Sequence, residues 1–214
     1  MSEPGEIAAH LSSPKQRDEV LELGMWTFLS TEILLFGGLI MTYMVYHHAD
    51  PVSFAEAGRQ TRIVIGTINT AVLLTSSFCV AAAIQAGQAG AVRSLKGLLI
   101  AAIVLGLIFL GLKGVEYAGE YRDHLVPGIN FAQSGPHAQG VRLFFIFYFL
   151  ATGLHAIHLL CGIVVLIVFL RCACQVVRRP RYLAGLRTAG LYWHFIDVVW
   201  IFLYALIYLP GRSG

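Results

Sequence analysis

The sequence predicts an all-α polytopic membrane protein built as a bundle of five transmembrane helices. Of its 214 residues, 57% are hydrophobic and only 13% are charged, a balance too apolar for a soluble domain. Five apolar stretches, each near the roughly 20 residues needed to cross a hydrocarbon core, are separated by short polar breaks. The alternating pattern of membrane β-barrel strands is missing from them. This composition excludes a water-soluble enzyme, a nucleic-acid-binding protein, a disulfide-stapled secreted module and a disordered tail.

Each stretch is expected to be helical, because backbone groups inside hydrocarbon must be satisfied within the segment. The first stretch follows a charged N-terminal segment without the features of a signal peptide. The third and fourth are separated by the longest loop, at 118–139, which contains Pro-Gly and Gly-Pro turn signals, and the fifth is rich in aromatic residues. We expect an N-terminal segment at 1–22, a transmembrane domain at 23–209 and a C-terminal tail at 210–214. The five predicted spans are Leu23–Tyr46, Arg62–Gln85, Gly97–Tyr117, Leu143–Leu170 and Ala189–Leu209.

The basic residues are distributed unevenly between the two sides of the predicted bundle. Nine Lys and Arg residues fall in the N-terminal segment and the loops on its side, and five fall on the other side. By the positive-inside rule we expect a cytoplasmic N-terminus, or one on the matrix side in an organelle, and a C-terminus on the outer side of the membrane. Four residues on the basic side are candidates for contact with lipid head groups: Arg93, Lys96, Arg171 and Arg178.

The cysteines include one Cys-x-Cys pair, Cys172 and Cys174. A single pair without a nearby histidine supplies at most half of a tetrahedral metal site. We therefore expect the cysteines to fill space and expect no metal in this chain.

Charged and polar residues at membrane depth indicate where function lies, since a charge in hydrocarbon is costly unless it is paired or neutralised. Glu32, in the first span, fits two interpretations: a neutral carboxyl group hydrogen-bonded to a neighbouring helix, or a group that handles protons. Lys113, Glu116 and Tyr117 share one face at the end of the third span. An ion pair between positions i and i+3 near the outer membrane surface explains them.

The last two spans carry histidines and one acid. His155 and His158 are three residues apart, a spacing that fits either haem or metal ligation or hydrogen bonding between helices. We favour hydrogen bonding, because the membrane spans contain no second suitable pair of histidines. In the fifth span, His194 and Asp197 are close enough in sequence to satisfy each other. We expect the aromatic stripe around Asp197 to form a packed interface.

In order, these segments strongly resemble subunit III of the haem-copper oxidases, in its short five-helix bacterial form. The resemblance extends from residue 23 to residue 209. It is most specific in the fifth span, which reads Tyr-Trp-His-Phe-Ile-Asp-Val-Val-Trp from Tyr192. The motifs that carry it lie at 23–38, 69–77, 116–117, 152–162 and 192–204.

The resemblance implies a non-catalytic accessory subunit that packs against subunit I of a terminal oxidase, near subunit II, and holds phospholipid in a cleft. Haem and copper would belong to the partner subunits, and Glu32 would match the family's buried carboxylate beside a proton-uptake route. The loop at 121–128 favours a cytochrome c oxidase over a quinol oxidase or a nitric oxide reductase relative. The residues alone also leave open a stand-alone proton channel or transporter that uses Glu32, His158 and Asp197.

Overall fold

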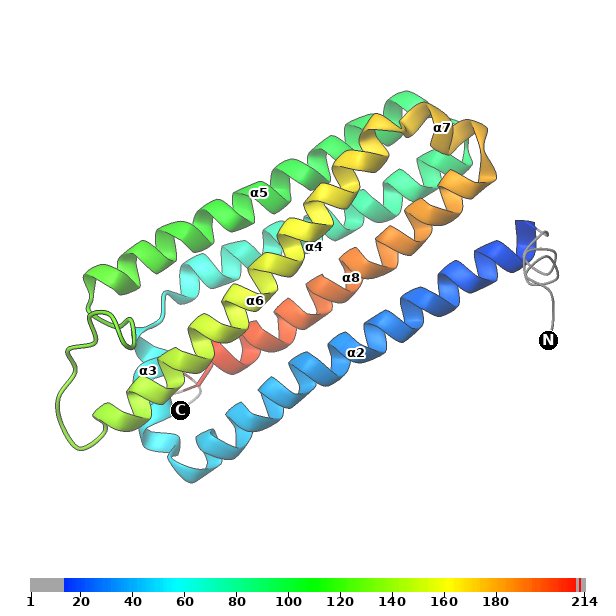
Figure 1. The fold of residues 1–214 in the computed structure, drawn as a ribbon. Coiled ribbons are helices and arrows are strands. Elements are labelled where there is room, and N and C mark those ends of the chain that lie inside the picture. Colours follow the sequence, from blue (N-terminus) through cyan, green and yellow to red (C-terminus); the bar gives the residue numbers. More distant parts are fainter. Residues whose placement is uncertain (1–13, 211, 213–214) are drawn as a thin grey trace, which may run out of the picture.

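Five long helices run side by side in the computed structural model, which describes residues 14–210 and 212 (Figure 1). All are long and apolar enough to cross a membrane, and no residue in these ranges is in a strand. The predicted fold class is therefore confirmed. The long helices are α2 (Pro14–Ala49), α4 (Ile63–Gln88), α5 (Val92–Arg122), α6 (Ala138–Arg171) and α8 (Pro180–Tyr208).

Two short helices mark the ends of the bundle. We call one of them the α7 end; it contains α7 (Ala173–Arg178), the turn between α4 and α5, and the start of α8 (Figure 1). We call the other the α3 end; it contains α3 (Pro51–Gln60) and the long loop between α5 and α6. Residues 1–13 of the expected N-terminal segment lie outside the described residues. Residues 211, 213 and 214 of the expected C-terminal tail lie outside them as well.

The sequence analysis did not predict α3, although its start has a clear physical cause. The Asp50 carboxylate caps the helix by accepting hydrogen bonds from the Ser53 backbone N–H, at 3.2 Å, and from the Ser53 hydroxyl, at 2.5 Å. Pro51 occupies the first turn, where its missing N–H costs nothing. The hydrogen bonds from Ser53 lower the pKa of the Asp50 carboxyl group below its usual value.

The helices extend beyond the predicted spans at most of their ends. The largest consequence is in α5, which continues past the predicted boundary at Tyr117 to Arg122. The following loop is correspondingly shorter than the predicted range of 118–139. Lys113 and Glu116 therefore lie well inside α5 rather than at its end.

Helix α8 occupies the centre of the bundle and α2 its edge (Figure 1). In its most apolar window 44% of α8 is buried, compared with 17% of α2. Trp193 of α8 is fully buried because glycines leave room for its ring: a Cβ at Gly162 would lie 3.1 Å from the ring, and one at Gly106 would lie 3.2 Å from it. The aromatic stripe of α8 thus forms the packed interface that the sequence predicts.

Candidate functional site

A carboxyl group and a histidine meet where α2 and α6 pack together. Glu32 Oε2 of α2 lies 2.9 Å from His158 Nε2 of α6, and their side chains are 12% and 15% exposed. The distance is that of an ion pair, although its geometry falls short of a directed hydrogen bond. Phe36 packs edge-on against the imidazole ring from one helical turn further along α2, at 5.3 Å between ring centres. The pair is therefore held by packing and remains slightly open at the surface of the chain.

The second ring nitrogen of His158 constrains where protons lie in this pair. His158 Nδ1 is 2.8 Å from the carbonyl oxygen of Leu154, which can only accept, so Nδ1 carries a proton. Nε2 and Glu32 Oε2 would repel each other at 2.9 Å if neither carried a proton. The 2.9 Å contact is therefore compatible with a protonated carboxyl group beside a neutral imidazole, or with a carboxylate beside an imidazolium.

The acid and histidine of α8 form a second polar group, facing α4. His194 Nδ1 contacts the Ser77 hydroxyl of α4 at 2.6 Å. Asp197 is 3% exposed and lies close to Ser77, but neither carboxylate oxygen has a directed hydrogen bond among the described residues. The expectation that His194 and Asp197 satisfy each other is wrong, because His194 turns to Ser77.

His155 does not form the hydrogen bond between helices that its sequence suggested. Its ring is fully buried, and neither nitrogen has a partner in the part of the chain that the structure describes. It packs between the rings of Phe109 and Trp200, at 5.5 Å and 5.1 Å between ring centres. His155 therefore acts as a flat aromatic spacer, whereas His158 makes the contact between helices.

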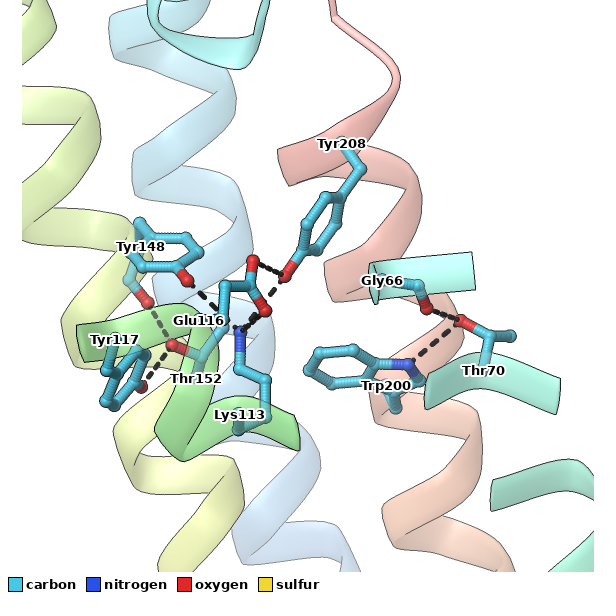
Figure 2. A network of polar contacts seen from close by, with 9 residues as sticks. All are labelled: Gly66, Thr70, Lys113, Glu116, Tyr117, Tyr148, Thr152, Trp200 and Tyr208. Atoms are coloured by element: carbon cyan, nitrogen blue, oxygen red, sulfur yellow. Dashed lines mark hydrogen bonds and ion pairs between the residues drawn. The ribbon is translucent and has the colours of Figure 1, made fainter. Parts of the chain in front are cut away.

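The most extensive polar network surrounds Lys113 (Figure 2). Its ammonium group donates to Glu116 Oε2 at 3.0 Å, to the Tyr208 hydroxyl at 3.0 Å and to the Tyr148 hydroxyl at 3.3 Å. The Tyr208 hydroxyl donates in turn to Glu116 Oε1 at 2.6 Å. An ammonium group has three N–H donors, so every donor of Lys113 has an acceptor.

Aromatic rings enclose the same ammonium group. It lies 4.8–5.7 Å from four ring centres, a distance range typical of cation–π contacts. These rings, from α5, α6 and α8, belong to Tyr117, Tyr148, Trp200 and Tyr208. Together with Lys113 and Glu116 they form what we call the lysine cage.

The sequence did not predict that other helices enclose this group. Lys113 and Glu116 are only 3% and 0% exposed, so their ion pair is inside the bundle. The pairing itself, at i and i+3, is confirmed. Tyr117 hydrogen-bonds Thr152 of α6 at 2.6 Å (Figure 2), which adds a second polar link between the cage and α6 beside that of Tyr148. The sequence analysis missed Tyr148, which precedes Thr152 by one turn on the same face.

The four candidates for lipid head groups all lie at the α7 end with exposed side chains. Arg93 and Lys96 are in the first turns of α5, Arg171 ends α6 and Arg178 ends α7.

Cys172 and Cys174 are at the same end and are unbridged. Across residues 14–210 and 212, no three side chains of His, Cys, Asp or Glu are grouped so that they could hold a metal ion.

Comparisons with known proteins agree with these features. The family model described as Cytochrome c oxidase subunit III matches residues 9–212. Cytochrome c oxidase subunit 3 of Thermostichus vulcanus is 28% identical over 89% of this chain and 87% of its own length. The protein of the same name from Synechocystis sp. is 29% identical over 96% of this chain and 81% of its own.

A relative that is named for a different electron donor is similar to the same degree. "Probable quinol oxidase subunit 3" of Staphylococcus aureus is 29% identical over 94% of this chain and 94% of its own length. Because the family model covers nearly the whole chain, and its helices are those of a multi-pass membrane protein, the chain belongs to the cytochrome c oxidase subunit III family.

Proposed function

We propose that this chain is the non-catalytic accessory subunit III of a haem-copper terminal oxidase in a bacterial inner membrane. It stabilises subunit I by packing against it, beside subunit II, while haem and copper reside in those partners. The family match over residues 9–212 carries this proposal. The basic residues gathered at the α7 end support a cytoplasmic location for that end, and with it a cytoplasmic N-terminus and an external C-terminus.

Within this role, the Glu32–His158 pair supports proton uptake by the partner subunit. The supporting observation is the 2.9 Å contact between Glu32 and His158, whose side chains are 12% and 15% exposed, with Glu32 on the peripheral helix α2. A group that exchanges protons with another chain must be accessible at the surface of its own chain. A fully enclosed group cannot take this role. The pair thus buffers proton delivery and does not conduct protons across the bundle by itself.

Purification of the chain from its native membrane in mild detergent tests the subunit assignment. We expect subunits I and II in equal amounts and haem bands in the reduced-minus-oxidised spectrum. Recovery of the chain alone, under conditions that keep a known oxidase intact, would contradict it. Proton conduction by the isolated chain in liposomes would instead support a channel.

Turnover of the intact complex tests the role of Glu32. We expect Glu32→Gln to shorten the time for which the oxidase sustains its initial rate, because the amide cannot release a proton. Glu56→Gln is the matched control, since Glu56 is an exposed acid on α3. Unchanged initial and sustained rates in Glu32→Gln would refute the proton role and leave the subunit assignment intact.

The electron donor is a separate question with two candidates. We propose cytochrome c, the donor named in two of the relatives, and the quinol oxidase relative makes quinol the second candidate. Oxidation of reduced cytochrome c and of a short-chain quinol by the purified complex distinguishes them. Faster turnover with quinol would overturn the proposed donor.

A further inference from the structure

One buried carboxyl group has no part in the proposed function. Asp197 of α8 is 3% exposed, and neither of its oxygens has a directed hydrogen bond among the described residues. No oppositely charged side chain in the described part of the chain lies within ion-pair distance of it. Because an unpaired carboxylate at membrane depth is costly, the group is stable there only as the protonated acid. Its proton must therefore have a route to it.

A groove of about 610 Å³ lies between α2, α4 and α8 near the α7 end. At the level of the helix ends its lining is polar and exposed, which allows water to enter. His194 also lines the groove, two turns beyond Arg187 on α8, which is about 10 Å at 1.5 Å per residue. The groove thus extends from the helix ends to an imidazole ring at membrane depth. The polar residues at its mouth are Glu22, Gln85, Gln88 and Arg187.

His194 is connected to Asp197 through one hydroxyl group. While its ring lines the groove, His194 Nδ1 lies 2.6 Å from the Ser77 hydroxyl of α4. The same hydroxyl lies close to the Asp197 carboxyl group. A hydroxyl group can donate one hydrogen bond while it accepts another, so Ser77 can pass a proton between the two side chains. His194 and Ser77 therefore link a hollow that water can enter to a buried acid.

This connection ends at Asp197. One turn further along α8, the Trp200 side chain is 1% exposed, and its indole N–H donates to the Thr70 hydroxyl at 3.0 Å. An indole N–H is a donor only and cannot take up a proton from the acid. On α4, Leu73 lies one turn from Ser77 and is also 1% exposed. Asp197 is thus reached from the α7 side only.

We propose that Asp197 is a proton-binding site that is loaded and emptied from the α7 side of the membrane through Ser77 and His194. During release, the Asp197 O–H gives its proton to Ser77 Oγ while Ser77 gives its own hydroxyl proton to His194 Nδ1. The resulting imidazolium passes its Nε2 proton to water in the groove, and a carboxylate remains at Asp197. Loading is the same transfer in reverse. The site is an internal proton store, separate from the Glu32–His158 pair.

Infrared spectroscopy of the full-length chain in lipid bilayers tests this proposal, because the C=O band of a protonated carboxyl group shifts when deuterium replaces its proton. Asp197→Asn should remove one such band, whereas Glu120→Gln, at another buried acid without a directed hydrogen bond in the described chain, should leave that band in place. After transfer from H₂O to D₂O the Asp197 band should shift. In Ser77→Ala and in His194→Phe the shift should be about tenfold slower, the rate effect of one lost hydrogen bond in the relay.

A bulky side chain in the groove, with the relay intact, provides an independent readout. Ala81 lines the groove one turn from Ser77, so Ala81→Phe should slow the exchange as well. Ala71→Phe is the control, because Ala71 is exposed on the same helix outside the groove; it should exchange at the wild-type rate.

Four results would each overturn the proposal. The first two are the absence of any band that depends on Asp197, and a wild-type band that does not shift, as expected if lipid rather than water fills the groove. The others are equal exchange rates in the two phenylalanine variants, and wild-type exchange in both Ser77→Ala and His194→Phe. None of these outcomes depends on other oxidase subunits, so the subunit assignment is tested separately.

Discussion

Replacement of Lys113 by methionine should destabilise the bundle more than any exposed lysine substitution. The change removes the cation from a site where Glu116 is 0% exposed and Lys113 is 3% exposed. It deletes three donated hydrogen bonds, at 3.0, 3.0 and 3.3 Å. The Tyr208 hydroxyl remains as a hydrogen-bond donor to the Glu116 carboxylate. The remaining buried charge, rather than the lost side-chain volume, dominates the expected effect.

The magnitude follows from the geometry. At 3.0 Å and an effective dielectric constant of about 20, Coulomb's law gives an attraction of about 5.5 kcal/mol. Removing one partner of a buried ion pair typically lowers the free energy of unfolding by about 3–5 kcal/mol, and we expect Lys113→Met to fall in that range. The double variant Lys113→Met, Glu116→Gln should lose less than the sum of the single variants, because it leaves no unpaired charge.

Titration of the purified chain with sodium dodecyl sulfate in mixed micelles, followed by circular dichroism, measures these free energies. Lys96→Met is the control on the same helix, because Lys96 is exposed, and it should stay within about 0.5 kcal/mol of the wild type. Single and double variants that are additive within about 0.5 kcal/mol would show that Lys113 and Glu116 are not energetically coupled. That result would refute the cage as a stabilising unit.

Two further predictions concern a close helix contact and a helix cap. Gly66→Ala should lower the free energy of unfolding by about 1–3 kcal/mol, because the new Cβ would lie 2.9 Å from the Tyr208 ring. Gly111→Ala is the control: a Cβ there would have no atom within 4 Å, so the variant should be neutral or stabilising in the same titration. Equal effects would contradict the packing of Tyr208. Asp50→Ala should speed hydrogen exchange in the first turn of α3, while Asp50→Asn keeps the cap. Because folding lowers the Asp50 pKa, the cap is intact above the usual aspartate pKa of 3.8 and is lost only as the pH falls through the still lower pKa of the folded state. Hydrogen exchange in the wild type that is as fast as in Asp50→Ala above pH 3.8 would contradict this.

The five long helices could be predicted because hydrocarbon imposes both a length and a helical backbone on each span. Their ends could not, since the helices continue beyond the apolar residues, where composition no longer marks them; α5, for example, ends at Arg122 and not at Tyr117. Helix α3 had a usable signal, an aspartate followed by proline at Asp50-Pro51. It was missed because a helix of 10 residues with a polar face is shorter than a membrane span.

The residue types at the site were easier to predict than their partners. Glu32 and His158 were both singled out for their depth in the membrane, but their 2.9 Å contact depends on the packing of α2 against α6, which the sequence does not specify. Lys113 shows the opposite failure. Its pairing with Glu116 follows from helix periodicity, but the cluster of polar residues resembled a membrane boundary. The rings that enclose it come from α6 and α8, so its burial could be recognised only in the folded chain.

The two buried ion pairs differ in a way that decides which of them suits proton exchange. In the lysine cage all three ammonium donors are used and both charged side chains are at most 3% exposed, so a proton has no adjacent acceptor outside the cage. In the Glu32–His158 pair the side chains are 12% and 15% exposed. Glu32 lies on α2, whose most apolar window is only 17% buried. Under the proposed function, in which haem and copper reside in the partner subunits, this chain influences their catalysis through groups that reach its neighbour. The more strongly bonded pair therefore stabilises the bundle, and the weaker, more exposed pair is the one through which this chain would act on a partner.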